Sequence, residues 1–382
     1  MASAVGGAPA RGGKKKKAQI PSLLHPLVYG AVRGVTTLPQ MVGVSTSIAG
    51  AAALGRLYGS ARFNRRRVEA ASERVRFALR DIDEAGARDL VLASFSHLFQ
   101  LGVEIACMPR LLSGDAWLRH VELGNLDGAL EALIEGRPSL MLTGHCGNWE
   151  MMGYTMAVLG FPIHALYRPL DMKPVDRWLR RTRARRGLIL VDKFGAATML
   201  PRLMAQGVPV GFVADQNAGD RGIFVPFFGR LTSSYKAIGL MAMQHKANVV
   251  CASARRLREG ESHIGDVGGG HDDGGLRYRV ELTDVIRPAD WEGHPDPLFY
   301  ITARYRRAIE QMVRIAPEQY LWMHRIWKSR PAHEKFNSPM PARLREKLQT
   351  LPWLSEAEVE TICDQSDRDR AYLAEHGLER LP

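Results

Sequence analysis

The sequence predicts an α/β fold, with a mostly parallel sheet flanked by helices and a hydrophobic helical anchor near the N-terminus. Two observations support this fold class. Short apolar runs typical of buried strands alternate with segments of helical periodicity, a pattern typical of a parallel sheet with helices on both faces. The stretch from Gly34 to Gly55 contains no charged residue and is long enough to cross a bilayer.

The N-terminal region is expected to have two parts. Residues 1–20 are rich in Gly and Ala and contain the run Lys14 to Lys17, which predicts a disordered basic segment. Residues 21–60 then form a hydrophobic helical segment that spans the membrane or lies in its interface. Because Pro39, Gln40 and many small polar residues interrupt this segment, a helical hairpin packed on the protein core is the alternative.

Residues 61–335 are expected to form the α/β domain. The predicted helices are Arg65–Asp81, Ala87–Cys107, Leu126–Glu135, Trp149 to about Leu159, Val175–Arg186, Ala196–Ala205 and Tyr235–His245. The predicted strands are Ser139–Thr143, Ile163–Tyr167, Leu188–Val191, Val208–Ala214 and Asn248–Ala254. A glycine-rich stretch, Leu257–Val280, predicts a long hairpin. Its acids and histidines, between His263 and Asp273, could hold a metal, but a solvated loop is the preferred interpretation and no metal site is predicted. Residues 336–382 form a polar helical tail to which we assign no function.

The most informative motif is Gly144-His145-Cys146-Gly147-Asn148-Trp149-Glu150, in which four residues separate a histidine from a carboxylate. It lies between a predicted buried strand and a predicted helix, for which Asn148 is a suitable N-cap. At this spacing Glu150 can fold back onto one nitrogen of His145, fixing the tautomer and leaving the other nitrogen as a proton acceptor. Such a base can remove a proton from an attacking hydroxyl near neutral pH.

Three further blocks follow this motif. They are Tyr167-Arg168-Pro169-Leu170 with the arginines from Arg177 to Arg186, then Asp215-Gln216-Asn217 with Ile223 to Gly229, and then Glu318 to Arg325 with Arg330-Pro331 behind it. In this order and spacing, the set resembles the bacterial lipid A late acyltransferases, the lauroyl and myristoyl transferases of the lysophospholipid acyltransferase superfamily. The resemblance covers about Leu23 to Pro331. In the predicted parallel sheet, loops at the strand ends would bring His145, Arg168 and Asp215 to one rim.

The resemblance implies that His145 and Glu150 activate a hydroxyl of a lipid A precursor or a related glycolipid, which attacks an acyl thioester on acyl carrier protein. The positions that match the family's substrate-binding blocks are Arg168, Arg183 or Arg185, and Asp215. Guanidinium groups bind phosphate through paired hydrogen bonds, so the arginines fit a phosphorylated acceptor. No cofactor is expected, and the implied location is the inner (cytoplasmic) membrane with the catalytic domain facing the cytoplasm.

The reaction class leaves three details of the site open. Acyl transfer passes through a tetrahedral intermediate, for which the backbone amides of Cys146 to Asn148, or the stretch ending at Gly229, are candidate donors. Cys146 could act as a covalent nucleophile, but a space-filling role is preferred. Phe224, Phe227 and Phe228 either brace the sheet or line an acyl pocket.

Other functions fit parts of the sequence. An acyl-CoA-dependent glycerophospholipid or phosphatidylinositol-mannoside acyltransferase is the alternative within the superfamily. The net charge of +12 suits an anionic lipid or carrier protein, whereas no recognised nucleic-acid module accompanies it, so nucleic acid is not an expected partner. An esterase or thioesterase is a further possibility, but the sequence lacks the Gly-x-Ser-x-Gly nucleophile elbow that is usual in such enzymes. A non-enzymatic basic membrane-binding protein would keep its function without His145.

Overall fold

The computed structural model describes residues 21, 24–112, 114–170, 172–184, 187–192, 194–258, 260–262 and 276–381. The predicted basic segment at residues 1–20, Arg185, and the acids and histidines considered for a metal lie outside the described residues.

The helices are α1 (His25–Met41), α2 (Val44–Ser60), α3 (Arg65–Ala78), α4 (Glu84–Leu111), α5 (Asp127–Ile134), α6 (Trp149–Val158), α7 (Lys173–Ala184), α8 (Ala196–Ala205), α9 (Lys236–His245), α10 (Pro288–Trp291), α11 (Pro297–Ile315), α12 (Ala332–Lys335), α13 (Ala342–Gln349) and α14 (Glu356–Glu375). Short 3-10 helices are η2 (Arg62–Asn64), η3 (Gly114–Arg119) and η4 (Pro317–Gln319). The strands are β1 (Val121–Leu123), β2 (Ser139–Thr143), β3 (His164–Tyr167), β4 (Ile189–Asp192), β5 (Val210–Val213), β6 (Ile223–Phe227), β7 (Arg230–Ser234), β8 (Asn248–Arg256) and β9 (Tyr278–Ile286).

The main sheet has seven strands in the order β1-β9-β8-β2-β5-β3-β4. Its neighbouring pairs are parallel except for β8 and β9, which are antiparallel. The hairpin predicted at Leu257–Val280 differs in its bounds, because its two strands are β8 and β9, and residues 263–275 between them lie outside the described residues. Strands β6 and β7 form a separate antiparallel pair. The predicted fold class, a mostly parallel sheet flanked by helices, is confirmed.

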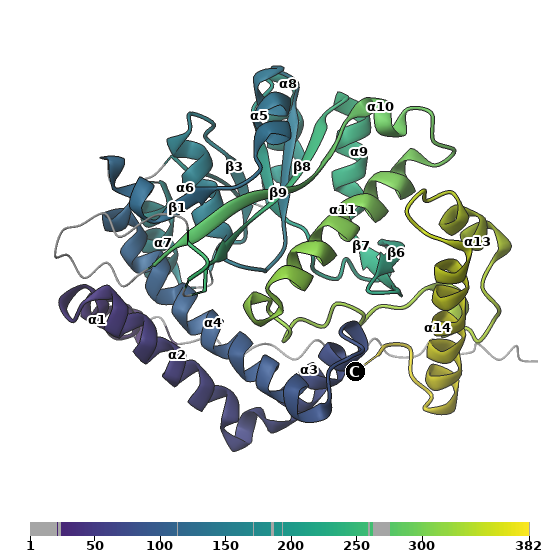
Figure 1. Ribbon diagram of the computed structural model, residues 1–382, viewed down its shortest axis with the longest axis horizontal. Coiled ribbons are helices and arrows are strands. Elements are labelled where there is room, and N and C mark those ends of the chain that lie inside the picture. Colours follow the sequence, from purple (N-terminus) through teal and green to yellow (C-terminus); the bar gives the residue numbers. More distant parts are fainter. Residues whose placement is uncertain are drawn as a thin grey trace, which may run out of the picture.

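Strand β2 shows why helices cover both faces of this sheet (Figure 1). All five of its residues are buried, as expected for a central strand. Successive side chains of a strand point to opposite faces. Accordingly, Leu140 and Leu142 join the large core that contains side chains of α8, α9 and α11, while Met141 packs with side chains of α5 and α6.

The uncharged stretch from Gly34 to Gly55 is divided between α1 and α2, so the single spanning helix that its length allows does not form. The break lies at Gly43, whose φ of 91° is accessible mainly to glycine. Helix α2 packs along α4 so closely that a Cβ atom at Gly55 would lie 2.5 Å from the carbonyl oxygen of Phe95. The small residues therefore allow close helix packing, as in the alternative prediction of a segment packed on the core.

The helix with the composition of a membrane span is α4. Among the described residues, its segment Glu84–Pro109 is the one that is long and apolar enough to cross a bilayer, although 44% of its most apolar window is buried. Glu104 lies within this segment, fully buried, and pairs with Arg256 of β8. A charge satisfied by the sheet in this way favours a core role for this face of α4. The apolar helix thus lies at α4 and not, as predicted, within residues 21–60.

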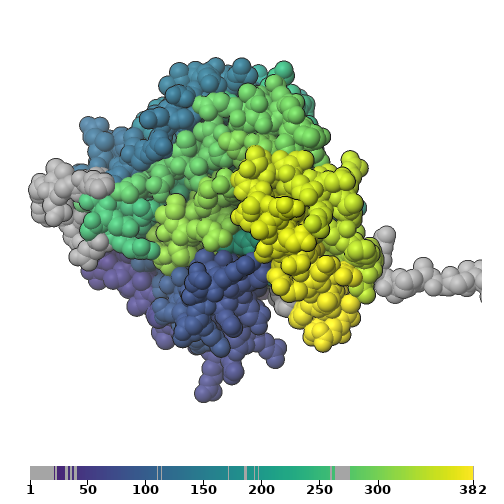
Figure 2. All heavy atoms as spheres, turned by 45° about the vertical axis from the view of Figure 1, so that its right-hand side comes forward, coloured from purple at the N-terminus to yellow at the C-terminus, as the bar shows by residue number. Residues whose placement is uncertain are grey.

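The C-terminal tail is helical and packs against the rest of the protein (Figure 2, yellow). Val359 and Ile362 of α14 belong to the same core as the side chains of α11. Asp369 of α14 accepts hydrogen bonds from Arg230 and from the fully buried Arg330, both at 2.7 Å. Because loss of one partner from a buried ion pair leaves an uncompensated charge, this cluster holds the tail in place.

Candidate active site

Three adjacent parallel strands, β2, β5 and β3, bring the predicted site residues together. Their carboxyl ends meet at one edge of the sheet, where ligands of open α/β sheets generally bind. His145 follows β2, Asp215 follows β5 and Arg168 follows β3. The loops after these strands therefore form the common rim that the sequence predicts.

His145 is held by Asp215. Its Nδ1 lies 2.6 Å from Oδ1 of Asp215, which is completely buried, whereas the side chain of His145 remains 17% exposed. The sequence predicted a different partner, Glu150. That predicted contact is wrong, because Glu150 pairs with Arg183 instead. Two carboxylates lie near the catalytic loop, and the fold assigns the one 70 residues away to the imidazole.

The pKa of Asp215 indicates which ring nitrogen of His145 carries the proton. Burial alone would raise the pKa of this carboxyl, but the interaction with the His145 imidazole, through charge and a hydrogen bond, together with the charge of Arg306, holds the pKa well below its usual range. An ionised carboxylate only accepts hydrogen bonds. Nδ1 of His145 must therefore donate to it, and Nε2 is left as the proton acceptor of the neutral ring.

Two aromatic rings fix the remaining position of the imidazole. The ring of Trp149 meets His145 edge-on, with centroids 5.0 Å apart. The ring of His324 lies 4.6 Å away, and burial, followed by the charge of His145, lowers the pKa of His324. The lowered pKa keeps His324 neutral beside the ring of His145. The only sequence signal for His324 was its place in the last of the matched blocks.

Glu150 and Arg183 join the helices on one side of the site. Glu150, in the first turn of α6, is 3% exposed and receives two hydrogen bonds from the guanidinium group of Arg183 on α7, one of them 3.0 Å long. The hydroxyl of Tyr154 adds a third link, donating to the carbonyl of Thr182 at 3.1 Å. Arg183 is therefore positioned by a charge-assisted, two-point contact.

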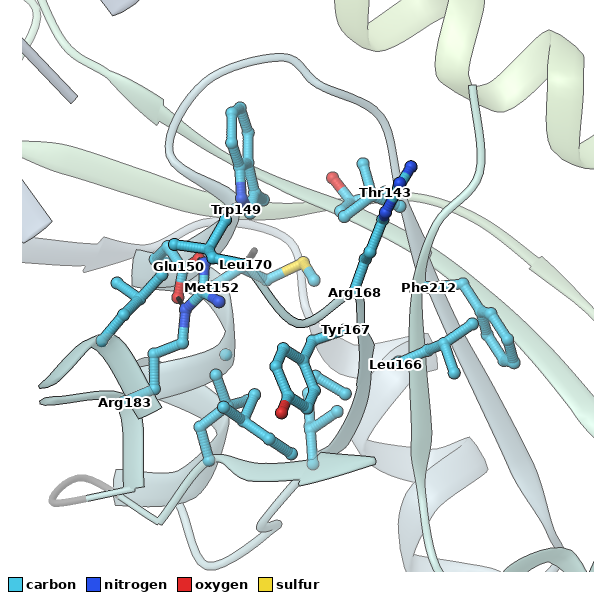
Figure 3. A pocket seen from close by; sticks show the side chains of 18 residues that line it. Thr143, Trp149, Glu150, Met152, Leu166, Tyr167, Arg168, Leu170, Arg183 and Phe212 are labelled. Carbon is cyan, nitrogen blue, oxygen red and sulfur yellow. Dashed lines mark hydrogen bonds and ion pairs between the residues drawn. The ribbon is translucent and has the colours of Figure 1, made fainter. Parts of the chain in front are cut away.

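A cavity of about 270 Å³ opens beside this pair (Figure 3). Most of its lining is apolar, and its polar members include Glu150, Arg183 and the exposed Arg168. The apolar side chains are Met152, Ile163, Leu166, Leu170, Leu179, Leu188, Leu190 and Phe212. Thr143 and Trp149 also line the cavity, so it reaches the loop that carries His145. A cavity of this kind suits a ligand with an apolar chain and an anionic group.

A buried polar network supports the catalytic loop from behind, and the sequence interpretation missed it. Asn148 is the N-cap that the sequence predicts, because its side-chain oxygen accepts a hydrogen bond from the backbone amide of Met151 at 2.9 Å. Its side-chain nitrogen donates a hydrogen bond to Glu104, also at 2.9 Å. Glu104 also accepts from Nε of Arg256 at 2.7 Å. A carboxylate buried in an apolar helix needs such partners. Glu104 was therefore the sequence feature that could have revealed this network.

The structure bears on the three details that the sequence left open. The amides of Gly147 and Asn148 donate to the carbonyls of Gln319 and Ala254, at 3.0 and 2.7 Å, so the prediction of these two as oxyanion donors is wrong. Gly229 lines a separate cavity beside the C-terminal tail. Cys146 is buried, and burial followed by the charge of Asp215 raises the pKa of its thiol to about 12, which disfavours a thiolate nucleophile. Phe227 and Phe228 are buried core residues.

The fold and site are compatible with an acyltransferase acting on a glycolipid, and comparison with known proteins shows this class. The chain belongs to the bacterial lipid A biosynthesis acyltransferase family, whose model matches residues 13–329, so the family expected from the four sequence blocks is confirmed. It is similar to the lipid A biosynthesis lauroyltransferase of Escherichia coli (strain K12), with 22% identity over 320 residues, 81% of this chain and 95% of the relative. It is also similar to the palmitoleoyltransferase of the same organism, with 25% identity over 230 residues, 58% of this chain and 68% of the relative.

Proposed function

We propose that this protein moves a fatty acyl group from acyl carrier protein to a hydroxyl of a lipid A precursor or a closely related glycolipid. The observation that carries the proposal is the short contact between His145 and the buried Asp215, beside a cavity with an apolar lining and two arginines. The family of the chain supports the substrate class. The contact supplies a base, and the cavity supplies places for an acyl chain and an anionic group.

The proposed reaction begins at Nε2 of His145, which takes the proton from the acceptor hydroxyl. The hydroxyl oxygen attacks the thioester carbonyl and gives a tetrahedral intermediate. When that intermediate collapses, the carbon–sulfur bond breaks and the thiolate leaves, taking the proton back from the imidazolium. The products are the ester and a free thiol. Asp215 stabilises the imidazolium formed in between and keeps Nδ1 as the donor.

The arginines suit the binding of a phosphorylated acceptor. Both Arg168 and Arg183 line the cavity, where Arg168 is exposed and Arg183 is held by Glu150. We infer that both contact an acceptor phosphate, and that Glu150 acts by positioning Arg183. Asp215, assigned to substrate by the sequence match, instead positions His145. Arg185 stays a sequence-based candidate.

We further propose that α1 and α2 rest on the inner membrane, with the catalytic domain on its cytoplasmic side. Large apolar side chains are exposed along and just beyond these helices. They are Leu24, Leu27, Met41, Val42, Leu54, Leu57 and Phe63. Exposed apolar surface of this kind marks membrane or protein contact. A helix lying in the interface would bury it beside the acceptor's own membrane.

The direct test is an acyl-transfer assay with the purified protein in neutral detergent. The acceptor glycolipid is incubated with acyl carrier protein or coenzyme A carrying the same acyl group, and lipid products are weighed by mass spectrometry. We expect an acceptor heavier by one acyl group, formed faster from the carrier protein. Release of free fatty acid without acylated lipid would indicate a thioesterase and contradict the proposal, and faster transfer from coenzyme A would assign the donor differently.

Arg183→Ala is expected to raise KM for the acceptor about tenfold or more, because a charge-assisted hydrogen bond contributes roughly 1.5–3 kcal/mol. KM for the acyl donor should change much less. The substitution leaves the buried Glu150 without its partner, so the double variant Arg183→Ala/Glu150→Gln separates this cost from lost binding. Arg202→Ala, at an exposed position on α8, is the matched control. A larger effect on donor KM would move Arg183 to the donor site.

A further inference from the structure

A second basic cavity lies between α1 and α7, which are neighbours in the fold (Figure 1). Its volume is about 250 Å³. Its lining residues are Tyr29 and Arg33 from α1, and Pro174, Arg177, Trp178, Arg181 and Thr182 from α7. Because side chains two apart on an α-helix point in nearly opposite directions, Arg181 and Arg183 serve different sides of α7. This cavity is therefore distinct from the one beside His145.

The second cavity gathers positive charge. Arg33, Arg177 and Arg181 line it together, and its described lining contains no carboxylate. The acid of α7, Asp176, accepts a hydrogen bond from the amide of Leu170 and lines a neighbouring depression, which Arg177 and Arg181 also line. With three guanidinium groups in its lining, this small cavity suits an anion that can accept hydrogen bonds from more than one of them.

The surroundings favour an anion that belongs to a lipid. The guanidinium carbon of Arg33 lies 5.8 Å from the ring centroid of Trp178. Tryptophan and tyrosine, which line this cavity together, are enriched at membrane–water interfaces because one end of each is apolar and the other is polar. A basic cavity lined by tryptophan and tyrosine suits a lipid that presents its phosphate at the membrane surface.

We propose that Arg33, Arg177 and Arg181 bind the phosphate group of a membrane lipid. The guanidinium fork matches phosphate oxygens through paired hydrogen bonds, which an ammonium group does not. The phosphate belongs either to the glycolipid acceptor or to a phospholipid of the surrounding bilayer, and the first case rests on the proposed function. The width of one helix, about 10 Å, separates this site from the cavity lined by Arg183. A phosphate held here would place its lipid next to the cavity beside His145.

The test compares the double variant Arg177→Ala/Arg181→Ala with Arg202→Ala/Arg343→Ala, which removes the same charge from exposed positions on α8 and α13. Acyl transfer is measured in neutral detergent micelles with the phosphorylated acceptor and with the same glycolipid after its phosphates are removed. If the acceptor's phosphate binds here, the first variant raises KM for the phosphorylated acceptor about 10- to 100-fold. KM for the dephosphorylated acceptor and for the control variant should stay near the wild-type values. Arg181→Lys, which keeps the charge but loses the fork, should fall between.

The second arm measures sedimentation of the protein with phosphatidylcholine vesicles, with and without phosphatidylglycerol. If the site takes a bilayer phosphate, Arg177→Ala/Arg181→Ala loses binding to the phosphatidylglycerol vesicles, the control variant keeps it, and KM in micelles is unchanged. A variant that matches its control in both arms would overturn the proposal. Failure of the proposed function would be seen separately. In that case the wild-type protein would acylate no lipid, while its binding to vesicles could still be measured.

Discussion

His145→Ala is expected to lower the rate of acyl transfer by at least about 10²- to 10⁴-fold, the range that a positioned general base contributes. The reason is that in the proposed reaction Nε2 of His145 accepts the hydroxyl proton, and alanine leaves no group in its place. The measurement is turnover at saturating acceptor and donor, with the acylated lipid quantified by mass spectrometry.

The fold should tolerate this substitution, because the side chain of His145 is partly exposed and lies at the rim of the sheet. Unchanged thermal unfolding and unchanged sedimentation with vesicles are the controls. A variant that remains folded and transfers acyl groups at the wild-type rate would show that the chemistry lies elsewhere. It would also revive the interpretation of this chain as a basic membrane-binding protein.

Asp215→Asn is expected to reduce turnover by about 10²- to 10⁴-fold with little change in either KM. An amide keeps the shape of the carboxylate but can present a donor to Nδ1, which favours the wrong tautomer of His145 and removes the charge that stabilises the imidazolium. The measurement is turnover and KM for both substrates.

Two comparisons separate this effect from misfolding. Asp215 is completely buried, so thermal unfolding must be followed alongside activity. The double variant His145→Ala/Asp215→Asn should be no slower than His145→Ala alone, because residues that act as one unit are not additive. Multiplying losses in the double variant would mean that Asp215 works independently of the imidazole.

The sequence predicted the frame of the site better than the contacts within it. The strand Ser139–Thr143 and the helix Ala196–Ala205 have the predicted bounds, since each is a periodic apolar run flanked by residues that end it. The common rim was also predictable, because parallel strands with helical crossovers place their carboxyl ends together. His145 and Asp215 follow two such strands, and these are neighbours in the sheet.

The pairing on that rim was not predictable from spacing alone. Glu150 and Asp215 were both available to His145, and sequence proximity favoured Glu150. The choice depends on α7, which presents Arg183 to Glu150 and so takes that carboxylate away from the imidazole. Partners of this kind become visible only when the helices are placed.

The N-terminal segment shows a similar limit. A stretch without charges can enter a membrane or pack closely on another helix, and both uses favour small residues. The contact of Gly55 with the backbone of α4 decides for packing at that position. Composition also gave no indication of the hydrogen-bond partners of Glu104, which come from β8 and from the loop that carries His145.

The measurement that tests the central assignment most directly is the turnover number of Asp215→Asn beside that of Glu150→Gln, in one assay with both substrates saturating. If the imidazole depends on the acid that follows β5, turnover falls by about 10²-fold or more in the first variant, and by about tenfold or less in the second. The opposite order, with Glu150→Gln nearly inactive and Asp215→Asn close to wild type, would contradict the account.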